Sequence, residues 1–178
     1  PLILGDVARK HGLAFRDGDV PRFWQRIHAH MGRLLVPGRG RLLPGVEALL
    51  DAVASEPGWI RALLTGNNRE MARIKLDHFG LLRRFDFGAY GDDGPDRDAI
   101  ARVAVRRARE LTGLPPSRCV VVGDTEHDVA CARAAGACVV AVATGARTRA
   151  ELEPHAPDLL LDDLADPGPL LEWARAIG

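Results

Sequence analysis

The sequence lacks an excess of charge of either sign: 24 basic residues balance 24 acidic ones, and the formal net charge is zero. A dedicated binder of nucleic acid carries a basic surface, so we expect no nucleic-acid partner. No apolar run is long enough to cross a bilayer, and no signal peptide is visible. These absences favour a soluble cytoplasmic protein without a membrane partner.

Cysteine and lysine are also scarce. The three cysteines, Cys119, Cys131 and Cys138, stand in apolar context without a CxxC pair, so we predict buried, reduced core residues. Apart from Lys10 and Lys75, every basic residue is arginine or histidine.

What is present is typical of one α/β domain with a small appendage, since the chain has 178 residues and is 47% hydrophobic. Residues 1–36 have a helical pattern, and residues 37–45, rich in glycine and proline, predict a hinge. From there on, apolar strands alternate with amphipathic helices. We expect strands within 59–65, 85–91, 118–124, 137–145 and 158–164, and helices within 45–55, 68–80, 96–113, 126–136, 148–154 and 167–178.

This alternation predicts a Rossmann-like, doubly wound parallel sheet. Ligands of such sheets bind where the strands end at their carboxyl side. The loops to inspect are therefore 65–68, 91–97, 123–128 and 143–148.

Two aspartates follow one predicted buried strand. Asp124 comes directly after it, and Asp128 lies four residues on, in the first turn of the next helix. Two converging carboxylates repel unless they share a cation or a proton, and hard oxygen ligands suit Mg²⁺. The alternative is that Asp124 or Thr125 only caps the helix and that Asp128 complements its dipole.

A second polar group follows the strand of residues 59–65. Thr65 ends it, and Gly66, Asn67 and Asn68 come next, so a hydroxyl and backbone amides at a helix start could hold a phosphate. An ordinary helix cap is the alternative. Lys75 lies within the apolar stripe of the following helix, where it either extends to solvent or reaches a buried anion.

Arg97 follows the turn of residues 92–96. It either reaches an anion at the strand end or belongs to a solvated turn that leads into a helix.

The order of these groups resembles the haloacid dehalogenase (HAD) superfamily, and the segments that carry the resemblance lie within residues 40–165. "LLTGN" is similar to its second motif, whose Thr or Ser holds the phosphoryl group. "GDTEHD" is similar to its fourth motif, whose acids help to bind Mg²⁺. Together with "TGNNREMARIKLDHFGL" and "FDFGAYGDDGPDR", they resemble the phosphoglycolate-phosphatase-like branch.

The resemblance implies roles for particular residues. Asp124 and Asp128 would bind Mg²⁺, while Thr65, Gly66 and Asn67 would hold the phosphoryl group. Many relatives carry the third-motif lysine in a Lys-Pro pair, which would fall near residues 94–97, where this chain has no lysine. We assign the role to Lys75, with Arg97 as the alternative.

The resemblance also implies a domain organisation. Residues 1–36 would form part of a helical cap, residues 37–45 the hinge, and residues 46–178 a HAD-like core. His28 and His30 would lie in the cap as surface or packing residues, because an i, i+2 pair does not share a helix face.

The first motif of the family, an Asp-x-Asp that supplies the nucleophile, is not found. "DRD" at 96–98 follows a turn and opens a helix, so its context differs. The missing strand would lie between those of residues 59–65 and 118–124. We therefore expect a truncated chain that lacks on the order of 40–50 residues and has no phosphatase turnover by itself.

The functional hypothesis is Mg²⁺-dependent hydrolysis of a small phosphorylated metabolite through an aspartyl-phosphate intermediate, by a monomer or homodimer. Halide removal from a haloacid is an alternative, against which the paired acids argue. A phosphomutase or phosphonatase also stays open, as does a non-catalytic binding or regulatory protein on the same scaffold.

Overall fold

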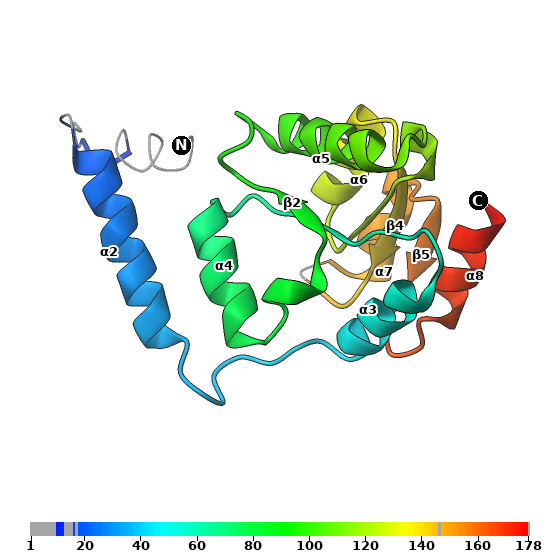
Figure 1. Cartoon of the computed structure of the whole chain (residues 1–178), viewed down its shortest axis with the longest axis horizontal. Coiled ribbons are helices and arrows are strands. Elements are labelled where there is room, and N and C mark those ends of the chain that lie inside the picture. The colour runs from blue at the N-terminus through cyan, green and yellow to red at the C-terminus, as the bar shows by residue number, and fades with distance from the viewer. Residues whose placement is uncertain (1–9, 13–15, 17, 146, 178) are drawn as a thin grey trace.

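The computed structural model describes residues 10–12, 16, 18–145 and 147–177 (Figure 1). Two of its longer helices begin at capping side chains that the sequence shows. Asn68 and Asp96 accept hydrogen bonds at the start of α4 and α5, and Gly113 ends α5 in the left-handed conformation. The helices are α2 (Asp19–Leu34), α3 (Val46–Ser55), α4 (Arg69–His78), α5 (Arg97–Thr112), α6 (Glu126–Ala134), α7 (Arg149–Leu152) and α8 (Gly168–Ala176), with short 3₁₀ turns at Leu82–Arg84, Pro116–Arg118 and Glu153–His155.

All described strands pair in parallel, as the alternation of strands and helices predicts. One sheet has the order β1-β2, and the other has the order β3-β4-β5. The strands are β1 (Ala62–Leu64), β2 (Phe87–Ala89), β3 (Val120–Gly123), β4 (Cys138–Val142) and β5 (Leu159–Leu161). Each falls inside a range expected from the sequence.

Strand β4 is the centre of the larger sheet, and its side chains alternate between two apolar layers. Val139 and Ala141 pack on α5, α6 and α7 through Val105, Val129 and Leu152. Val140 and Val142 face the opposite layer, where Leu170 and Ala174 of α8 cover them. The sheet is therefore covered on both faces, which accounts for its continuous apolar runs.

Between the two sheets lies a cavity of about 680 Å³, which we call the central gap. It is lined by both inner strands and by apolar residues of α3, α5 and α8. Val122 of β3, which would be covered in a continuous sheet, has an exposed fraction of 41%. The predicted separation of the 59–65 and 118–124 strands is thus confirmed, since β1 and β3 do not pair with each other.

The backbone of both inner strands has one side directed at the central gap. Thr65 donates its amide to the Ala89 carbonyl, and the Cys119 carbonyl accepts from the Cys138 amide. Because backbone polar groups alternate sides along a strand, the amides and carbonyls at positions 62, 64, 120 and 122 point away from β2 and β4. Among the described strands, none pairs with these groups.

The two outer edges are arranged differently. The outward carbonyl of Gly88 in β2 accepts a hydrogen bond from Arg107 Nη1 at 2.7 Å, and that guanidinium also pairs with Asp93. The outward carbonyl of Leu160 in β5 accepts from Arg149 Nη2 at 3.1 Å, and Arg149 pairs with Asp162. On each outer edge, an arginine held by an aspartate therefore occupies the outward carbonyl, which opposes pairing with another strand.

Helix α2 lies beside α4, at the end of the connection that includes the predicted hinge (Figure 1). Residues 36–45 contain no helix or strand. Gly45 closes this connection with φ of 81°, and a Cβ there would lie 1.4 Å from the carbonyl oxygen of Leu164. Only glycine fits that close approach.

Other expectations have mixed outcomes. All three cysteines are free thiols, as predicted, but only Cys131 is buried, and burial raises the pKa of its thiol. The helical pattern at 1–36 is confirmed for Asp19–Leu34, while most of residues 1–17 lie outside the described residues. Among the described residues, no helix is both long and apolar enough to cross a membrane.

Candidate functional site

The loop after β1 links two of the predicted site residues through a third. Thr65 Oγ1 accepts hydrogen bonds from the backbone amide of Asn67 at 3.2 Å and from its side-chain Nδ2 at 2.9 Å. The other end of the same side chain, Oδ1, accepts from Lys75 Nζ at 3.1 Å. Lys75 stands two helical turns beyond the loop, so it returns to the strand end instead of extending along α4.

Asn68 starts helix α4. Its Oδ1 accepts from the amide of Met71 at 2.8 Å, which is the geometry of a helix cap. Thr65 itself does not cap α4. Its hydroxyl and the exposed Gly66 stand before the helix, where backbone amides favour an anion.

Asp128 lies at the carboxyl end of β3 and is buried, with an exposed fraction of 4%. Its Oδ2 accepts from the amides of Asp124 and Thr125, at 3.1 and 3.0 Å, and from Thr125 Oγ1 at 2.8 Å. A Cβ on Gly123 would lie 2.2 Å from its carboxyl carbon, so the carboxylate rests directly on the strand end. Thr125 is the N-cap of α6 and Asp128 is the third residue of a capping box, so of the two proposed caps the structure selects Thr125.

The other oxygen of this carboxylate, Oδ1, accepts from Arg97 Nη2. Arg97 is the first residue of α5, and it bridges from the loop after β2 to the loop after β3. Burial would lower the pKa of Arg97, but the hydrogen bond and charge of Asp128 outweigh it and raise that pKa. Arg97 therefore reaches an anion at the strand ends, the carboxylate of Asp128. The alternative, that it belongs to a solvated turn, is not what the structure shows.

Asp124 lies beside the turn that follows β4. A Cβ on Gly145 would lie 1.5 Å from its Oδ2, so this turn packs directly on the carboxylate. Next to it, Arg147 donates to both carboxylate oxygens of Glu126, at 2.8 and 2.6 Å, and holds the pKa of Glu126 at about 2. Among the described residues, no cluster of three or more His, Cys, Asp or Glu side chains is placed to hold a metal ion.

These groups share one edge of the molecule. The amide of Gly91, after β2, donates to the Asn67 carbonyl at 2.8 Å, which joins the loops after β1 and β2. Arg97 in turn joins the loop after β2 to Asp128. All the predicted site residues therefore lie at the carboxyl edge, with Thr65 and Lys75 beyond one side of the central gap and Asp124 and Asp128 beyond the other.

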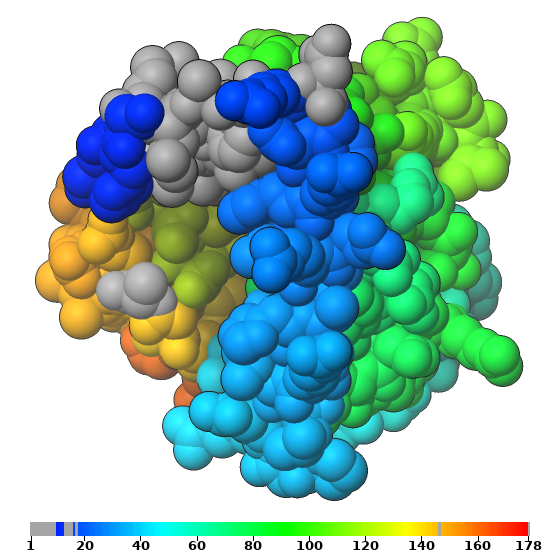
Figure 2. Space-filling view, turned by 90° about the vertical axis from the view of Figure 1, so that its left-hand side faces the viewer, coloured from blue at the N-terminus to red at the C-terminus, as the bar shows by residue number. Residues whose placement is uncertain are grey.

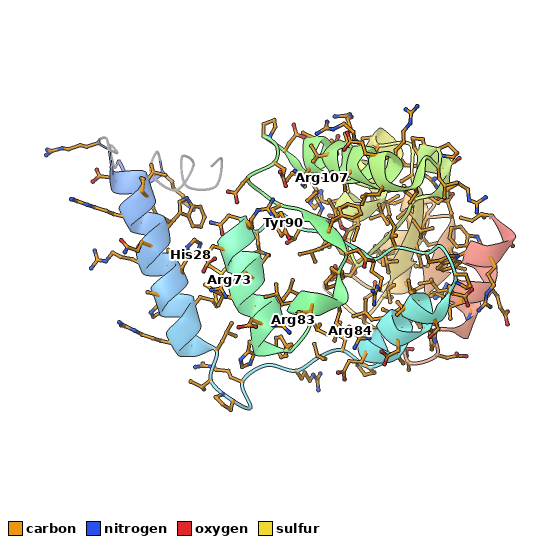
Figure 3. The ribbon with its side chains drawn as sticks, in the orientation of Figure 1. His28, Arg73, Arg83, Arg84, Tyr90 and Arg107 are labelled. Carbon is orange, nitrogen blue, oxygen red and sulfur yellow. The ribbon has the colours of Figure 1, made fainter. Side chains whose placement is uncertain are left out.

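Helix α2 contributes a side chain that the sequence analysis assigned to surface or packing. His28 Nε2 lies 3.0 Å from Asn68 Oδ1. Figure 3 shows His28 on the side of α2 that faces α4. The space-filling view toward α2 shows a hollow between this helix and the yellow-to-orange part of the chain (Figure 2). The helical pattern of residues 1–36 placed His28 on a helix, but it could not identify Asn68 as the partner, which lies 40 residues away.

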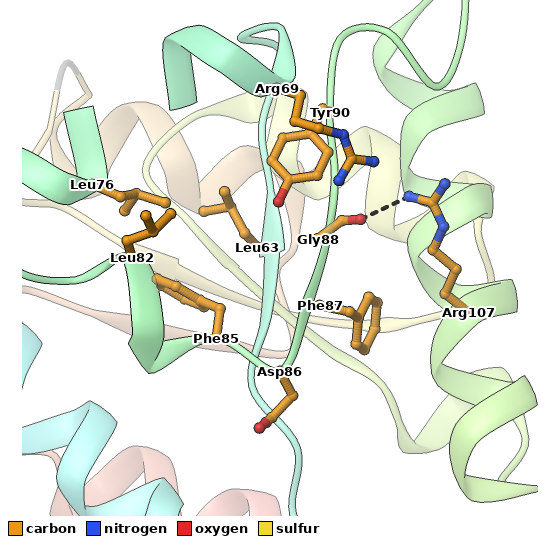
Figure 4. Close-up of a pocket in the computed structure, with 10 residues that line it drawn as sticks. All are labelled: Leu63, Arg69, Leu76, Leu82, Phe85, Asp86, Phe87, Gly88, Tyr90 and Arg107. Carbon is orange, nitrogen blue, oxygen red and sulfur yellow. Dashed lines mark hydrogen bonds between the residues drawn. The ribbon is translucent and has the colours of Figure 1, made fainter. Parts of the chain in front are cut away.

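A separate pocket of about 410 Å³ lies against β2, beside α4 and α5 (Figure 4). Arg69 stacks over the Tyr90 ring at 4.4 Å, above an apolar floor that includes Leu76 and Phe85. None of the predicted site residues lines it. Two of its charged groups, Arg107 and Asp86, are already paired within the protein.

Comparison with known proteins gives consistent matches. The sequence model of the haloacid dehalogenase-like hydrolases matches residues 4–133, and a HAD-hydrolase-like model matches residues 100–167. A phosphoglycolate phosphatase of Agrobacterium fabrum is 30% identical over 177 residues, which cover 95% of this chain and 74% of the relative. A 5'-nucleotidase of Pseudomonas aeruginosa is 27% identical, with 83% and 66% covered.

Among solved structures, CbbY of Rhodobacter sphaeroides in complex with xylulose-(1,5)bisphosphate has a TM-score of 0.69 and 25% identity. The match covers 87% of this chain and 68% of that protein. The chain thus spans about two thirds to three quarters of the length of these proteins.

Proposed function

Because the chain belongs to the haloacid dehalogenase-like hydrolase family, we propose that the whole protein hydrolyses a small phosphomonoester. One observation carries the proposal. Thr65 and Lys75 follow β1, and Asp124 and Asp128 follow β3, so hydroxyl, ammonium and carboxylate groups lie at the carboxyl ends of parallel strands on two sides of the central gap. The phosphatases among its relatives support the same reaction class.

The phosphoryl group would bind at the β1 side. The Thr65 hydroxyl can donate or accept a hydrogen bond, and Lys75 supplies a positive charge on the other side of the Asn67 side chain. A phosphoryl oxygen that displaced the Asn67 amide from this pair would gain a charge-assisted hydrogen bond. Lys75 therefore remains our assignment for the basic group that balances phosphoryl charge.

Arg97 would act differently. Its guanidinium is committed to Asp128, so it neutralises that buried carboxylate and holds the β3 loop. Reorientation toward a phosphoryl oxygen would require Asp128 to find another cation. In the proposed site, Mg²⁺ would be that cation, so release of Arg97 from Asp128 and binding of the metal ion would occur together.

The carboxylates of the β3 loop fit Mg²⁺ in chemistry, since both supply hard oxygens at one strand end. Asp124 would hold the ion, and Asp128 Oδ1 would join it where Arg97 moves away. Bound there, Mg²⁺ would neutralise charge on the phosphoryl oxygens. Asp128 Oδ2 would continue to hold the amides of Asp124 and Thr125, and so fix the loop.

The nucleophile would come from a strand that fills the central gap. A parallel strand there would pair with the inner backbone groups of both β1 and β3, and its apolar side chains would fill the cavity. Its carboxyl end would emerge between Thr65 and Asp124. The Asp-x-Asp that the family resemblance implies would then lie beside both halves of the site.

Two of the alternatives make distinct predictions, and a phosphomutase or phosphonatase stays open beside them. A haloacid dehalogenase would release halide without Mg²⁺ and would not depend on Asp128. A non-catalytic protein on this scaffold would keep the central gap unfilled. The substrate is proposed only as a small phosphorylated metabolite, because the relatives include both a phosphoglycolate phosphatase and a nucleotidase.

The test uses the complete natural protein and measures phosphate release from an aryl phosphate, phosphoglycolate and a nucleoside monophosphate. We expect turnover that chelation abolishes and that Asp124→Asn lowers by at least about 100-fold. Asp96→Asn makes the same chemical change at the cap of α5 and should leave turnover intact. A parallel assay supplies a small haloacid: halide release from it without phosphate release from the esters would favour the dehalogenase, and neither activity would favour the non-catalytic alternative.

A further inference from the structure

Helix α2 is held to the rest of the protein by few contacts. No residue of it is buried, and α4 is the described helix against which it packs. Its side toward α4 carries Trp24 and His28, whose rings stack with their centroids 5.9 Å apart. The His28–Asn68 hydrogen bond is therefore a specific polar attachment in an otherwise loosely covered contact.

The direction of this hydrogen bond follows from the partner. Asn68 Oδ1 already accepts from the Met71 amide, so the atom that faces His28 is the amide oxygen. An oxygen acceptor requires that His28 Nε2 carry the proton and donate. The stack on Trp24 holds the imidazole in the plane that this donation needs.

Asn68 is adjacent in sequence to Asn67, the residue that joins Thr65 and Lys75. Movement of Asn68 would therefore be transmitted through one peptide bond to Asn67, and from there through the hydrogen bonds of Asn67 to the Thr65 hydroxyl. His30, two residues along α2, is exposed and turned away from this loop.

We propose that His28 is a positioning residue that ties α2 to the loop of Thr65–Asn68, so that docking of α2 and ordering of this loop are one event. The proposal rests on the proposed function, since it assigns that loop to the phosphoryl group. His28 acts through Asn68 and touches no reacting atom. A ligand that enters beside α2 would meet an ordered Thr65 only while this attachment is made.

The experiment compares three variants of this chain by hydrogen exchange, followed at single amides. His28→Phe keeps a ring against Trp24 but removes the donor, His28→Gln restores a donor, and His30→Phe is the matched control. We expect His28→Phe to speed exchange of the Asn67 and Met71 amides about fivefold, as loss of one hydrogen bond implies. His28→Gln should return the rates toward the original ones, and His30→Phe should leave them unchanged.

A second measurement titrates inorganic phosphate into the same variants of the complete natural protein. We expect His28→Phe to weaken phosphate binding about fivefold and His28→Gln to recover much of it. Unchanged exchange and unchanged affinity in His28→Phe would overturn the positioning role while leaving the proposed function intact. Faster exchange in a protein that binds no phosphate would instead uphold the coupling and contradict the proposed function.

Discussion

The carboxylate of Asp128 accepts four hydrogen bonds: from two backbone amides, the Thr125 hydroxyl and Arg97. It is the one buried charged residue in the described part of the chain. A carboxylate with this many donors organises a loop, because each donor would otherwise need a partner of its own. The strand end of β3 therefore depends on Asp128 whether or not a metal ion is bound.

We expect Asp128→Asn to lower the free energy of unfolding by about 2–4 kcal/mol. The NH₂ group of the asparagine side chain would face either Arg97 or the donors of Asp124 and Thr125, none of which can accept its hydrogens. Arg97, which is partly buried, would also lose its counter-charge. Urea unfolding followed by circular dichroism gives the value. Asp96→Asn is the control, since Asn caps a helix as well as Asp does, and equal stability of the two variants would contradict the prediction.

The Asp93 carboxyl, which holds the arginine on the outer edge of β2, gives a pH prediction. Hydrogen bonding by Arg107 keeps the pKa of Asp93 below its ordinary value. The folded pKa is lowered, so the stabilisation is present above pH of about 4, where an unfolded aspartate ionises, and is lost as pH falls through the lowered pKa.

This pKa can be followed by NMR titration of the Asp93 carboxyl carbon. In Arg107→Gln we expect the midpoint to rise toward the ordinary aspartate value, while Arg107→Lys retains part of the shift. A midpoint that does not respond to loss of Arg107 would show that another group lowers the pKa.

At the scale of single residues, the sequence predicted which residues gather at one edge but not the hydrogen bonds among them. Thr65 and Asp124 could be placed because each directly follows a strand and strand ends share an edge, whereas Lys75 was singled out by its position in the apolar stripe of its helix and by the family resemblance. The Arg97–Asp128 pair joins residues 31 positions apart, and His28–Asn68 joins residues 40 positions apart. Such pairs depend on how elements pack, which periodicity along the chain does not encode.

At the scale of elements, the inner and outer strand edges should differ in hydrogen exchange. In this chain, the amides of Val120 and Val122 face the central gap, while those of Val121 and Gly123 face β4. We expect exchange at Val120 and Val122 to be at least about tenfold faster, since only the other two are held in a ladder.

The complete natural protein is the comparison for this measurement. If a strand fills the gap there, protection at Val120 and Val122 should rise to that of their neighbours. Equal, slow exchange at all four positions of the 178-residue chain would contradict the open edge.

The order of the elements was predictable because helix and strand signals are local. Apolar runs, capping residues and left-handed glycines stand within a few residues of the boundaries they set. The division into two sheets was expected from the family resemblance, and the pattern of β3 alone would not show it. A strand buried on both faces has the same sequence whether one edge or both are paired.

At the scale of the whole molecule, the central gap divides the apolar interior into two parts. In the described part of the chain, the apolar residues that line the gap are accessible to a small ligand. We expect the 178-residue chain to bind an apolar fluorescent dye such as anilinonaphthalene sulfonate at neutral pH while its near-ultraviolet circular dichroism stays native. A cavity of about 680 Å³ is large enough for such a ligand.

The site of the dye can be tested by a pair of substitutions. Ala104→Lys places a charge on the α5 wall of the cavity and should abolish most of the fluorescence increase. Ala150→Lys, on the exposed surface of α7, is the matched control and should leave it unchanged. Equal fluorescence in both variants would place the dye elsewhere.

The arginines on the outer edges set a limit on how this molecule can associate. Arg107 covers β2 and Arg149 covers β5, so neither outer edge offers its outward carbonyl to another chain. Within the described residues, the central gap therefore offers an extended peptide more unpaired backbone groups than either outer edge does. Toward extended peptides the described part of the molecule is thus close to monovalent: one strand in the gap would pair with both inner strands, while an arginine on each outer edge opposes the growth of a fibril.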